Sequence, residues 1–202
     1  MNLKESFELI NSFSKIDFGL GKRSNSISND LETQKGISFP IEFKEYIDNY
    51  APINNQYFSG VGNSISLYNS ERLSWVMDGY NFNPIERKSI AGWDDSWFLF
   101  ADEGADPIIV DLSEQLEYSV VYQAMHGTGD WQFGAIADSI GQFLVCIAAF
   151  NHALTGFNVE DAIVDNENGF NLHEKCASWL FPFISKYANN YYEDWLSVFE
   201  NS

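Results

Sequence analysis

The sequence predicts an α+β domain in which an antiparallel sheet occupies the middle of the chain and helices lie before and after it. Two observations predict this. Apolar residues recur at helical spacing near both ends of the chain, whereas short apolar runs separated by turn residues occupy the middle. Strands joined by turns this short pair antiparallel, because parallel neighbours need a crossover of a dozen residues or more.

Two helices are expected before the sheet. An apolar stripe at helical spacing predicts an amphipathic helix over residues 2–14. Residues 18–36 are polar and rich in Gly, Ser and Asn, which is typical of a loop. A second helix is expected over residues 39–47, with Ser38 as its candidate cap and Pro40 near its first position.

The middle of the chain has the pattern of strands. Apolar runs or alternation predict strands at residues 64–68, 97–100, 107–111 and 118–122. A short helix is expected from Ser70 to about Met77. Turn residues fill positions 102–106 and again Gly127-Thr128-Gly129-Asp130.

A long helix is expected from Ser139, its candidate cap, to about Gly156. This helix is apolar on more than one side, so another element should cover its back. The C-terminal segment is the expected cover, since it is apolar over residues 179–183 and amphipathic over 191–199, where a final helix is predicted.

The acidic charge is concentrated in one segment. The formal net charge is −18, and residues 1–88, 89–174 and 175–202 carry −2, −15 and −1. A block of one sign repels itself and destabilises the compact state, so it is tolerated most readily where its field steers a cationic partner. The alternative is that the charge reflects only an acidic, Asn-rich composition of a cytosolic protein.

Five groups of residues stand in a fixed order at the joints of these elements. They are Phe39-Pro40 with Phe43-Lys44-Glu45-Tyr46-Ile47; Ile65, Leu67 and Tyr68 with Glu71 and Leu73; Phe98-Leu99-Phe100-Ala101-Asp102 with Gly104, Asp106-Pro107 and Asp111-Leu112; Val121-Tyr122 with His126-Gly127 and Trp131; and Ile136-Ala137 with Ser139 and Phe143-Leu144. In this order they resemble the SUKH superfamily, specifically its Smi/Knr branch, and the resemblance is strongest over residues 30–150.

The resemblance implies a mostly antiparallel sheet flanked by helices and no enzymatic activity. Residues 1–156 are then the Smi/Knr-like domain, and residues 157–202 are a helical extension packed on it. Bacterial members of the superfamily commonly resemble immunity proteins that neutralise polymorphic toxins, often nucleases or deaminases. The alternative is a regulatory interaction module of the cell-wall synthesis type, as in similar fungal domains.

Residues that might carry chemistry do not form a recognisable catalytic or metal site, so no catalytic residue, metal or cofactor is expected. The acidic stretch around Asp161 to Gly169 does not match a calcium loop, because Val164 would stand at its first ligand position, and it is interpreted as a surface turn. His126 precedes a glycine-rich turn that lacks the basic residue of a phosphate loop. Cys146 and Cys176 are expected to be buried free thiols.

A partner-binding surface is the remaining hypothesis. Its predicted residues are Asp94, Asp95, Asp102, Glu103, Asp106, Trp93, Trp97 and Trp131. Tryptophans beside carboxylates suit a basic protein surface, with cation–π contacts at the centre and charge at the rim. The alternative is that these tryptophans only close the sheet edge against helices; Trp93 is the one expected to be most exposed.

The expected partner is a basic toxin domain. Nucleic acid and anionic membrane are poor direct partners, because both need basic contacts. The start of the chain has no signal-like apolar run, and the longest apolar run, residues 143–150, is too short to span a bilayer. The sequence therefore predicts a cytoplasmic protein, and it does not indicate an oligomeric state.

Overall fold

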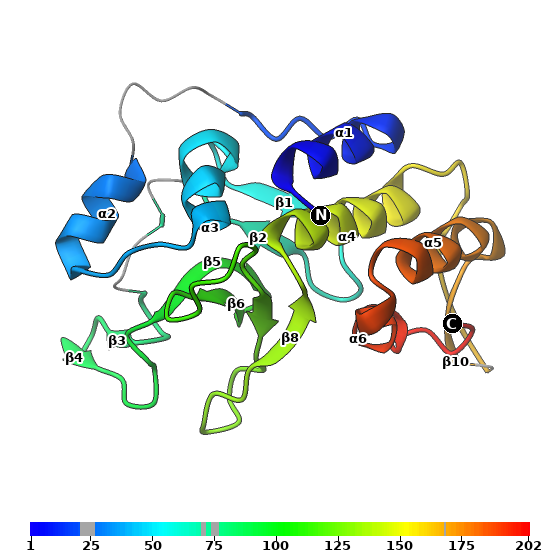
Figure 1. Cartoon of the computed structure of the whole chain (residues 1–202). Coiled ribbons are helices and arrows are strands. Elements are labelled where there is room, and N and C mark those ends of the chain that lie inside the picture. The colour runs from blue at the N-terminus through cyan, green and yellow to red at the C-terminus, as the bar shows by residue number, and fades with distance from the viewer. Residues whose placement is uncertain (21–26, 70–71, 74–76, 168) are drawn as a thin grey trace.

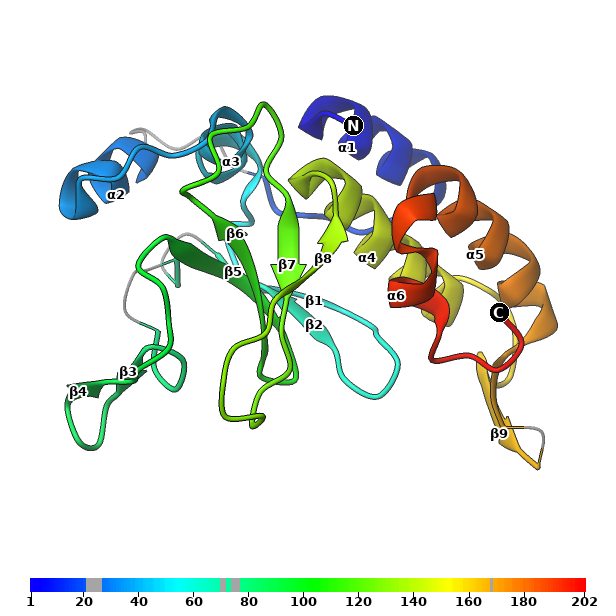
Figure 2. The same cartoon turned by 60° about the horizontal axis from the view of Figure 1, so that its bottom comes forward.

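The computed structural model describes residues 1–20, 27–69, 72–73, 77–167 and 169–202. Helices cover one face of a central sheet, and small hairpins project from opposite ends of the molecule on the other side (Figure 1). Figure 2 shows these hairpins at either end, with the loop between β7 and β8 hanging between them. The predicted α+β class is confirmed.

The central sheet has six strands in the order β1-β2-β5-β6-β7-β8, and every neighbouring pair is antiparallel, as predicted. The strands are Gln56–Phe58, Ile65–Leu67, Trp97–Glu103, Asp106–Asp111, Val121–Gln123 and Gly134–Ala137. The predicted strand at 118–122 is therefore shifted toward its C-terminal end, and β1 and β8 were not predicted. A bulge between Leu99 and Ala101 interrupts the register of β5 against β6.

Two further hairpins lie outside this sheet. Strands β3 (Phe82–Asn83) and β4 (Lys88–Ser89) form the first, and β9 (Ile163–Asn166) and β10 (Gly169–Leu172) form the second. The acidic stretch interpreted as a surface turn thus contributes strand β9, so that part of the interpretation is wrong. The short helix expected from Ser70 to Met77 falls mainly outside the described residues.

The N-terminal helices are α1 (Leu3–Phe13), α2 (Ile27–Lys35), α3 (Ile41–Glu45) and a π-helical turn at Tyr46–Tyr50. Helix α1 agrees with its prediction and is closed by a capping box between Asn2 and Glu5. Helix α2 overturns the prediction of a loop over residues 18–36. It has little apolar periodicity, and a tertiary contact holds it instead, because the Ser28 N–H and hydroxyl both donate to Asp48.

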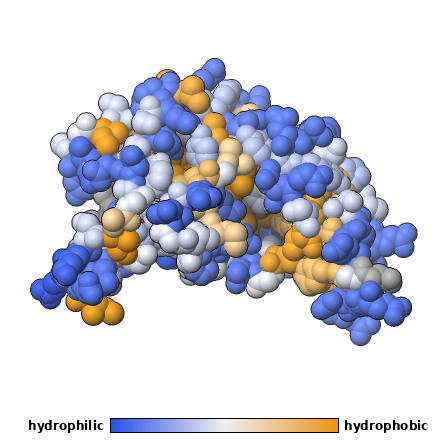
Figure 3. Space-filling model, turned by 90° about the horizontal axis from the view of Figure 1, so that it is seen from below, coloured by the Kyte–Doolittle hydropathy of each residue, from blue (hydrophilic) through white to orange (hydrophobic). Residues whose placement is uncertain are grey.

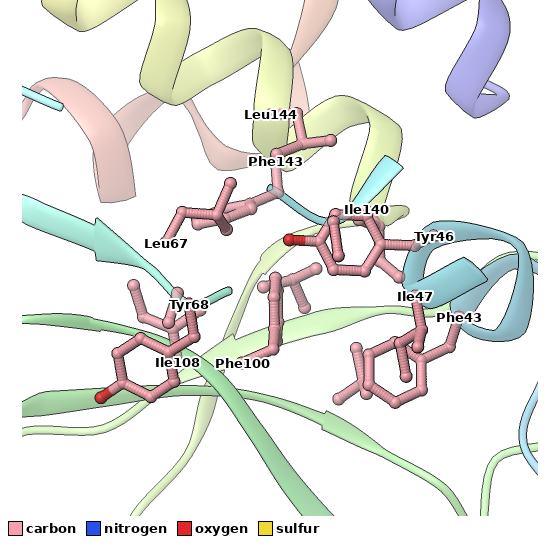
Figure 4. Packing of buried hydrophobic residues seen from close by; sticks show 14 of the residues in the cluster. Phe43, Tyr46, Ile47, Leu67, Tyr68, Phe100, Ile108, Ile140, Phe143 and Leu144 are labelled. Atoms are coloured by element: carbon pink, nitrogen blue, oxygen red, sulfur yellow. The ribbon is translucent and has the colours of Figure 1, made fainter. Parts of the chain in front are cut away.

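Helix α4 (Ile140–Thr155) is the centre of the fold. Ser139 caps it as predicted, since its hydroxyl oxygen accepts a hydrogen bond from the Gln142 N–H at 2.9 Å. One side of α4 packs on the sheet, where Phe143 lies 5.6 Å from Phe100 between ring centroids (Figure 4). The aromatic rings of Phe43 and Tyr46 pack against the same Phe100.

The C-terminal segment covers the back of α4. It comprises the β9–β10 hairpin, α5 (Glu174–Tyr187), a 3-10 turn at Asn189–Tyr191 and α6 (Tyr192–Leu196). Cys146, Ala149 and Phe150 on α4 share a buried cluster with Leu180, Ile184 and Phe199. The helical character of the extension is confirmed, but the final helix is shorter than the predicted 191–199.

Candidate partner-binding surface

The sheet has two unlike faces. The face toward α4 carries Phe98, Val110 and Val121, which stand opposite one another in the register of β5, β6 and β7. The opposite face carries Trp97, Ile109 and Tyr122, because side chains alternate along a strand. No described helix covers this second face, so its aromatic residues are the first candidates for contact with another molecule (Figure 2).

Five half-buried rings come together there, and we call them the aromatic face: Tyr80, Trp93, Trp97, Trp131 and Phe133. Trp93 lies at the centre, with ring centroids 5.8 Å from Trp97 and 5.6 Å from Trp131. Phe133 lies 4.7 Å from Trp97 and Tyr80 lies 5.9 Å from Trp93. The structure thus brings together all three tryptophans that the sequence singled out, although they are as much as 38 positions apart.

The central indole is held in place. Trp93 Nε1–H donates to the backbone carbonyl of Trp97 at 3.2 Å, which fixes the ring plane and satisfies its only donor. Trp93, the tryptophan expected to be most exposed, is half-buried like the other two. These rings pack against one another and against strand residues rather than closing the sheet edge against helices. They form a pre-ordered apolar surface.

Carboxylates surround the aromatic face. Asp94 and Asp95 follow Trp93 directly and are exposed. Asp94 Oδ1 accepts hydrogen bonds from the N–H and the hydroxyl of Ser96, both at 2.8 Å, and these bonds lower the pKa of Asp94. The side chain of Asp95 is 91% exposed, and its carboxylate lies 3.9 Å from Lys35 Nζ. Both carboxylates are exposed to solvent.

Sequence reasoning missed three further carboxylates at this site. Asp111 stands opposite Trp97 in the β5–β6 register, Glu114 accepts a hydrogen bond from the Tyr122 hydroxyl at 2.7 Å, and exposed Asp130 precedes Trp131. A cavity of about 180 Å³ lies between Trp97, Asp111, Glu114, Tyr122, Ile109 and Phe133. No Lys or Arg lines it. The signal that could have found Phe133 is its position two residues after Trp131, the spacing of one strand face.

Burial affects two tyrosines of this region. It raises the pKa of Tyr80 to about 12, and it also raises that of Tyr122, where the Glu114 carboxylate adds to the effect. Both hydroxyls therefore stay protonated at neutral pH, and the Tyr122 hydroxyl donates to Glu114. Neither hydroxyl is poised as a base.

The other three predicted acids lie at the far end of the β5–β6 hairpin, roughly 16–20 Å from Trp97 along the strand at 3.3 Å per residue. Asp102 is buried and accepts a hydrogen bond from the Tyr68 hydroxyl, while Arg72 Nη2 lies 3.5 Å from it. The Arg72 guanidinium also stacks on the Tyr68 ring at 3.8 Å. This trio is an internal polar network, and its Asp102 carboxylate is already occupied.

Glu103 and Asp106 point to the helix-covered side of the sheet. Asp106 accepts a hydrogen bond from the backbone N–H of His126 at 2.7 Å and lies 2.6 Å from its Nδ1, which anchors the loop after β7. Glu103 is half-buried and accepts one hydrogen bond, from Gln123 Nε2 at 2.9 Å. The three tryptophans therefore form one joined group with Asp94 and Asp95. Asp102 lies at its margin, where the Tyr68–Arg72 network reaches Tyr80, and Glu103 and Asp106 lie on the other side of the sheet.

Comparison with protein families gives one match. Residues 26–146 match the model of the SMI1 / KNR4 family (SUKH-1). The chain belongs to this family. Comparisons with curated proteins and with solved structures gave no match. The resemblance to the Smi/Knr branch is thereby confirmed, for a family that includes immunity proteins.

The SMI1/KNR4 match contains the whole aromatic face and all the carboxylates around it, but it ends within α4. Among the described residues, no group of His, Cys, Asp and Glu is arranged to hold a metal ion. None of the helices in the described ranges has the length and apolar character needed to cross a bilayer. Both cysteines are buried and free.

Proposed function

We propose that this protein is a non-enzymatic immunity protein that binds and neutralises a toxin domain with a basic surface, and that the aromatic face is its contact region. One observation carries the proposal: five half-buried rings, pre-packed and surrounded by Asp94, Asp95, Asp111, Glu114 and Asp130, lie on a sheet face that no described helix covers. Membership of the SMI1/KNR4 family supports it, since that family includes immunity proteins.

The charge and the aromatic rings have different roles in binding. The charge of −15 over residues 89–174 attracts a cationic surface and raises the association rate above the ~10⁵–10⁶ M⁻¹s⁻¹ of neutral pairs. The aromatic rings then exclude water and stack on Arg or Lys, which governs the dissociation rate. In the view of Figure 3, hydrophobic residues lie among hydrophilic ones, both in the middle of the underside and toward its two ends.

The test begins with the genes beside this one: a toxin domain encoded there is co-expressed with this protein to score survival. We expect Trp93→Ala to weaken binding by at least tenfold, as a central aromatic anchor would. Trp179→Ala, which removes a half-buried tryptophan from α5, is the matched control and should leave binding intact. Loss of protection by Trp179→Ala alone would move the contact region to the helical side.

The charge contribution is tested separately by association kinetics at low and physiological salt. We expect the triple change Asp94→Asn, Asp95→Asn and Asp130→Asn to slow association by about tenfold at low salt and to change the dissociation rate little. Asp165→Asn, on the distant β9–β10 hairpin, is the single-charge control. Association that is insensitive to ionic strength would exclude electrostatic steering.

A further inference from the structure

A second concave site lies on the other side of the sheet. It is a cavity of about 150 Å³ between the sheet and the C-terminal helices, and we call it the junction pocket. Residues of the sheet and its loops form one wall: Gly60, Val61, Ile65, Glu103, Gln123 and Ile136. Residues of α4 and of the chain's last turns form the other: Phe150, Asp194, Trp195, Ser197 and Val198.

Glu103 is the polar centre of the junction pocket. Its Oε2 accepts the hydrogen bond from Gln123, whereas its Oε1 accepts none from any described residue. Burial raises the pKa of this carboxyl, because the hydrogen bond from Gln123 does not offset the loss of hydration of the charged form. None of the ion pairs found in the described parts of the chain includes Glu103 or Asp194. The pocket therefore presents a desolvated carboxylate without a cation.

The apolar wall is rigid. Trp195 Nε1–H donates to the Ile136 carbonyl at 2.9 Å, and its ring lies 5.6 Å from that of Phe150. This bond links α6 to β8 and fixes the indole where it lines the pocket. Val198 lines the pocket at its edge and is 44% exposed. An occupant with an apolar stem would cover it.

We propose that the junction pocket receives an arginine side chain of the partner protein. The guanidinium can donate hydrogen bonds to the free Oε1 of Glu103 and to Asp194 at the exposed rim of the pocket. Its planar face can stack on the indole of Trp195. Its aliphatic stem packs against apolar groups such as Val61 and Val198. A lysine offers a point charge without the planar face, so it uses this pocket less well.

This inference rests on the proposed function in one respect: the arginine is supplied by the toxin partner. It also gives the segment after the family match a role. Five of the eleven lining residues lie beyond residue 146, where the SMI1/KNR4 match ends. The C-terminal extension thus completes a recognition pocket on the family's sheet and selects what the pocket accepts.

The test uses small probes, so it does not depend on a toxin. The purified protein is titrated with N-acetylarginine amide, and the Trp195 indole N–H is followed by NMR after assignment through Trp195→Phe. We expect saturable shifts with a dissociation constant on the order of millimolar, which is typical of so small a ligand. The neutral isostere N-acetylcitrulline amide should bind at least tenfold more weakly, and N-acetyllysine amide severalfold more weakly.

Two variants identify the carboxylates. Glu103→Gln keeps the shape and should weaken arginine binding by about tenfold, and Asp194→Asn, at an exposed position, should weaken it by severalfold without affecting the fold. Glu117→Gln and Asp165→Asn are exposed controls with the same charge changes. Circular dichroism checks that each variant is folded.

Equal binding of the arginine and citrulline probes, or unchanged binding by both pocket variants, would overturn the pocket assignment. Tighter binding of the lysine probe would overturn the choice of arginine. These outcomes are independent of the toxin test. If the arginine probe does not bind but Trp93→Ala still reduces protection, only the pocket assignment is refuted. If the probe binds but the protein gives no protection from the toxin, only the immunity function is refuted.

Discussion

The carboxylate of Glu42 accepts a hydrogen bond from the backbone N–H of Ser119 at 2.7 Å, although 77 positions separate the two residues. The same carboxylate accepts hydrogen bonds from the N–H groups of Ile140 and Gly141, at 3.3 and 3.2 Å, in the first turn of α4. A buried acid thus joins α3, the segment before β7 and the positive end of the longest helix. It ties the N-terminal helices to the sheet and to α4.

Replacing this acid should be costly. Glu42→Ala leaves buried N–H donors without partners, so we expect the free energy of unfolding to fall by about 3 kcal/mol. Urea unfolding measures the change. Glu45→Ala, at an exposed position of the same helix, is the control and should cost less than about 0.5 kcal/mol. Equal losses in both variants would mean that the Glu42 contacts contribute little.

The turn between β5 and β6 contains a strained residue. Ala105 has a φ of +85°, next to Gly104 at +58°, so both turn residues are in a region that favours glycine. We expect Ala105→Gly to raise the free energy of unfolding by about 0.5–1 kcal/mol, because relief of strain outweighs the added freedom of the unfolded chain. Ala91→Gly, at an exposed turn position without positive φ, should instead be neutral or destabilising.

The contribution of Glu103 to the free energy of unfolding depends on pH, and its direction follows from the pKa shift. Burial raises the pKa of its carboxyl, so the folded state holds the proton more tightly than the unfolded chain. The stability from this preference is present at low pH and is lost as the pH rises through the folded-state pKa. Relative to wild type, Glu103→Gln should therefore gain stability between about pH 4 and pH 7. Denaturant unfolding at both pH values checks this. The same gain in the exposed control Glu117→Gln would contradict it.

The two cysteines should be inert in the folded protein. Burial raises the pKa of both Cys146 and Cys176, and only the thiolate reacts with disulfide reagents. We expect no modification by Ellman's reagent under native conditions and two thiols released to it on unfolding in denaturant. Rapid reaction of either thiol in the native state would show that the α4–α5 contact opens readily.

Sequence reasoning found the elements that carry a strong local pattern. Strands β5 and β6, the capped start of α4 and helix α1 all have uninterrupted apolar runs or stripes. Helix α2 has no such pattern, because only Ser28 and Leu31 are buried on it. Its position depends on the hydrogen bonds from Ser28 to Asp48, a contact that no local pattern announces.

The candidate site divides in the same way. Trp93, Trp97 and Asp94 were predicted from neighbours in sequence and are neighbours in space. Asp102 and Glu103 were grouped with them on charge alone, yet adjacent strand residues point to opposite faces. Asp102 therefore joins Tyr68 on one face, and Glu103 enters the junction pocket on the other. The hydrogen-bond partners of each carboxylate depend on tertiary packing, and the number of charges along the sequence gives no information about that packing.

Helix α4 has apolar contacts on both sides, with the sheet in front and α5 behind. The family match ends at residue 146, in the middle of this sixteen-residue helix. A chain shortened at that point would lose half of α4 and expose what remained of its back, so the boundary of sequence similarity is not the boundary of a cooperative folding unit. For this chain the smallest piece expected to fold on its own reaches to Phe199, whose ring closes the rear cluster.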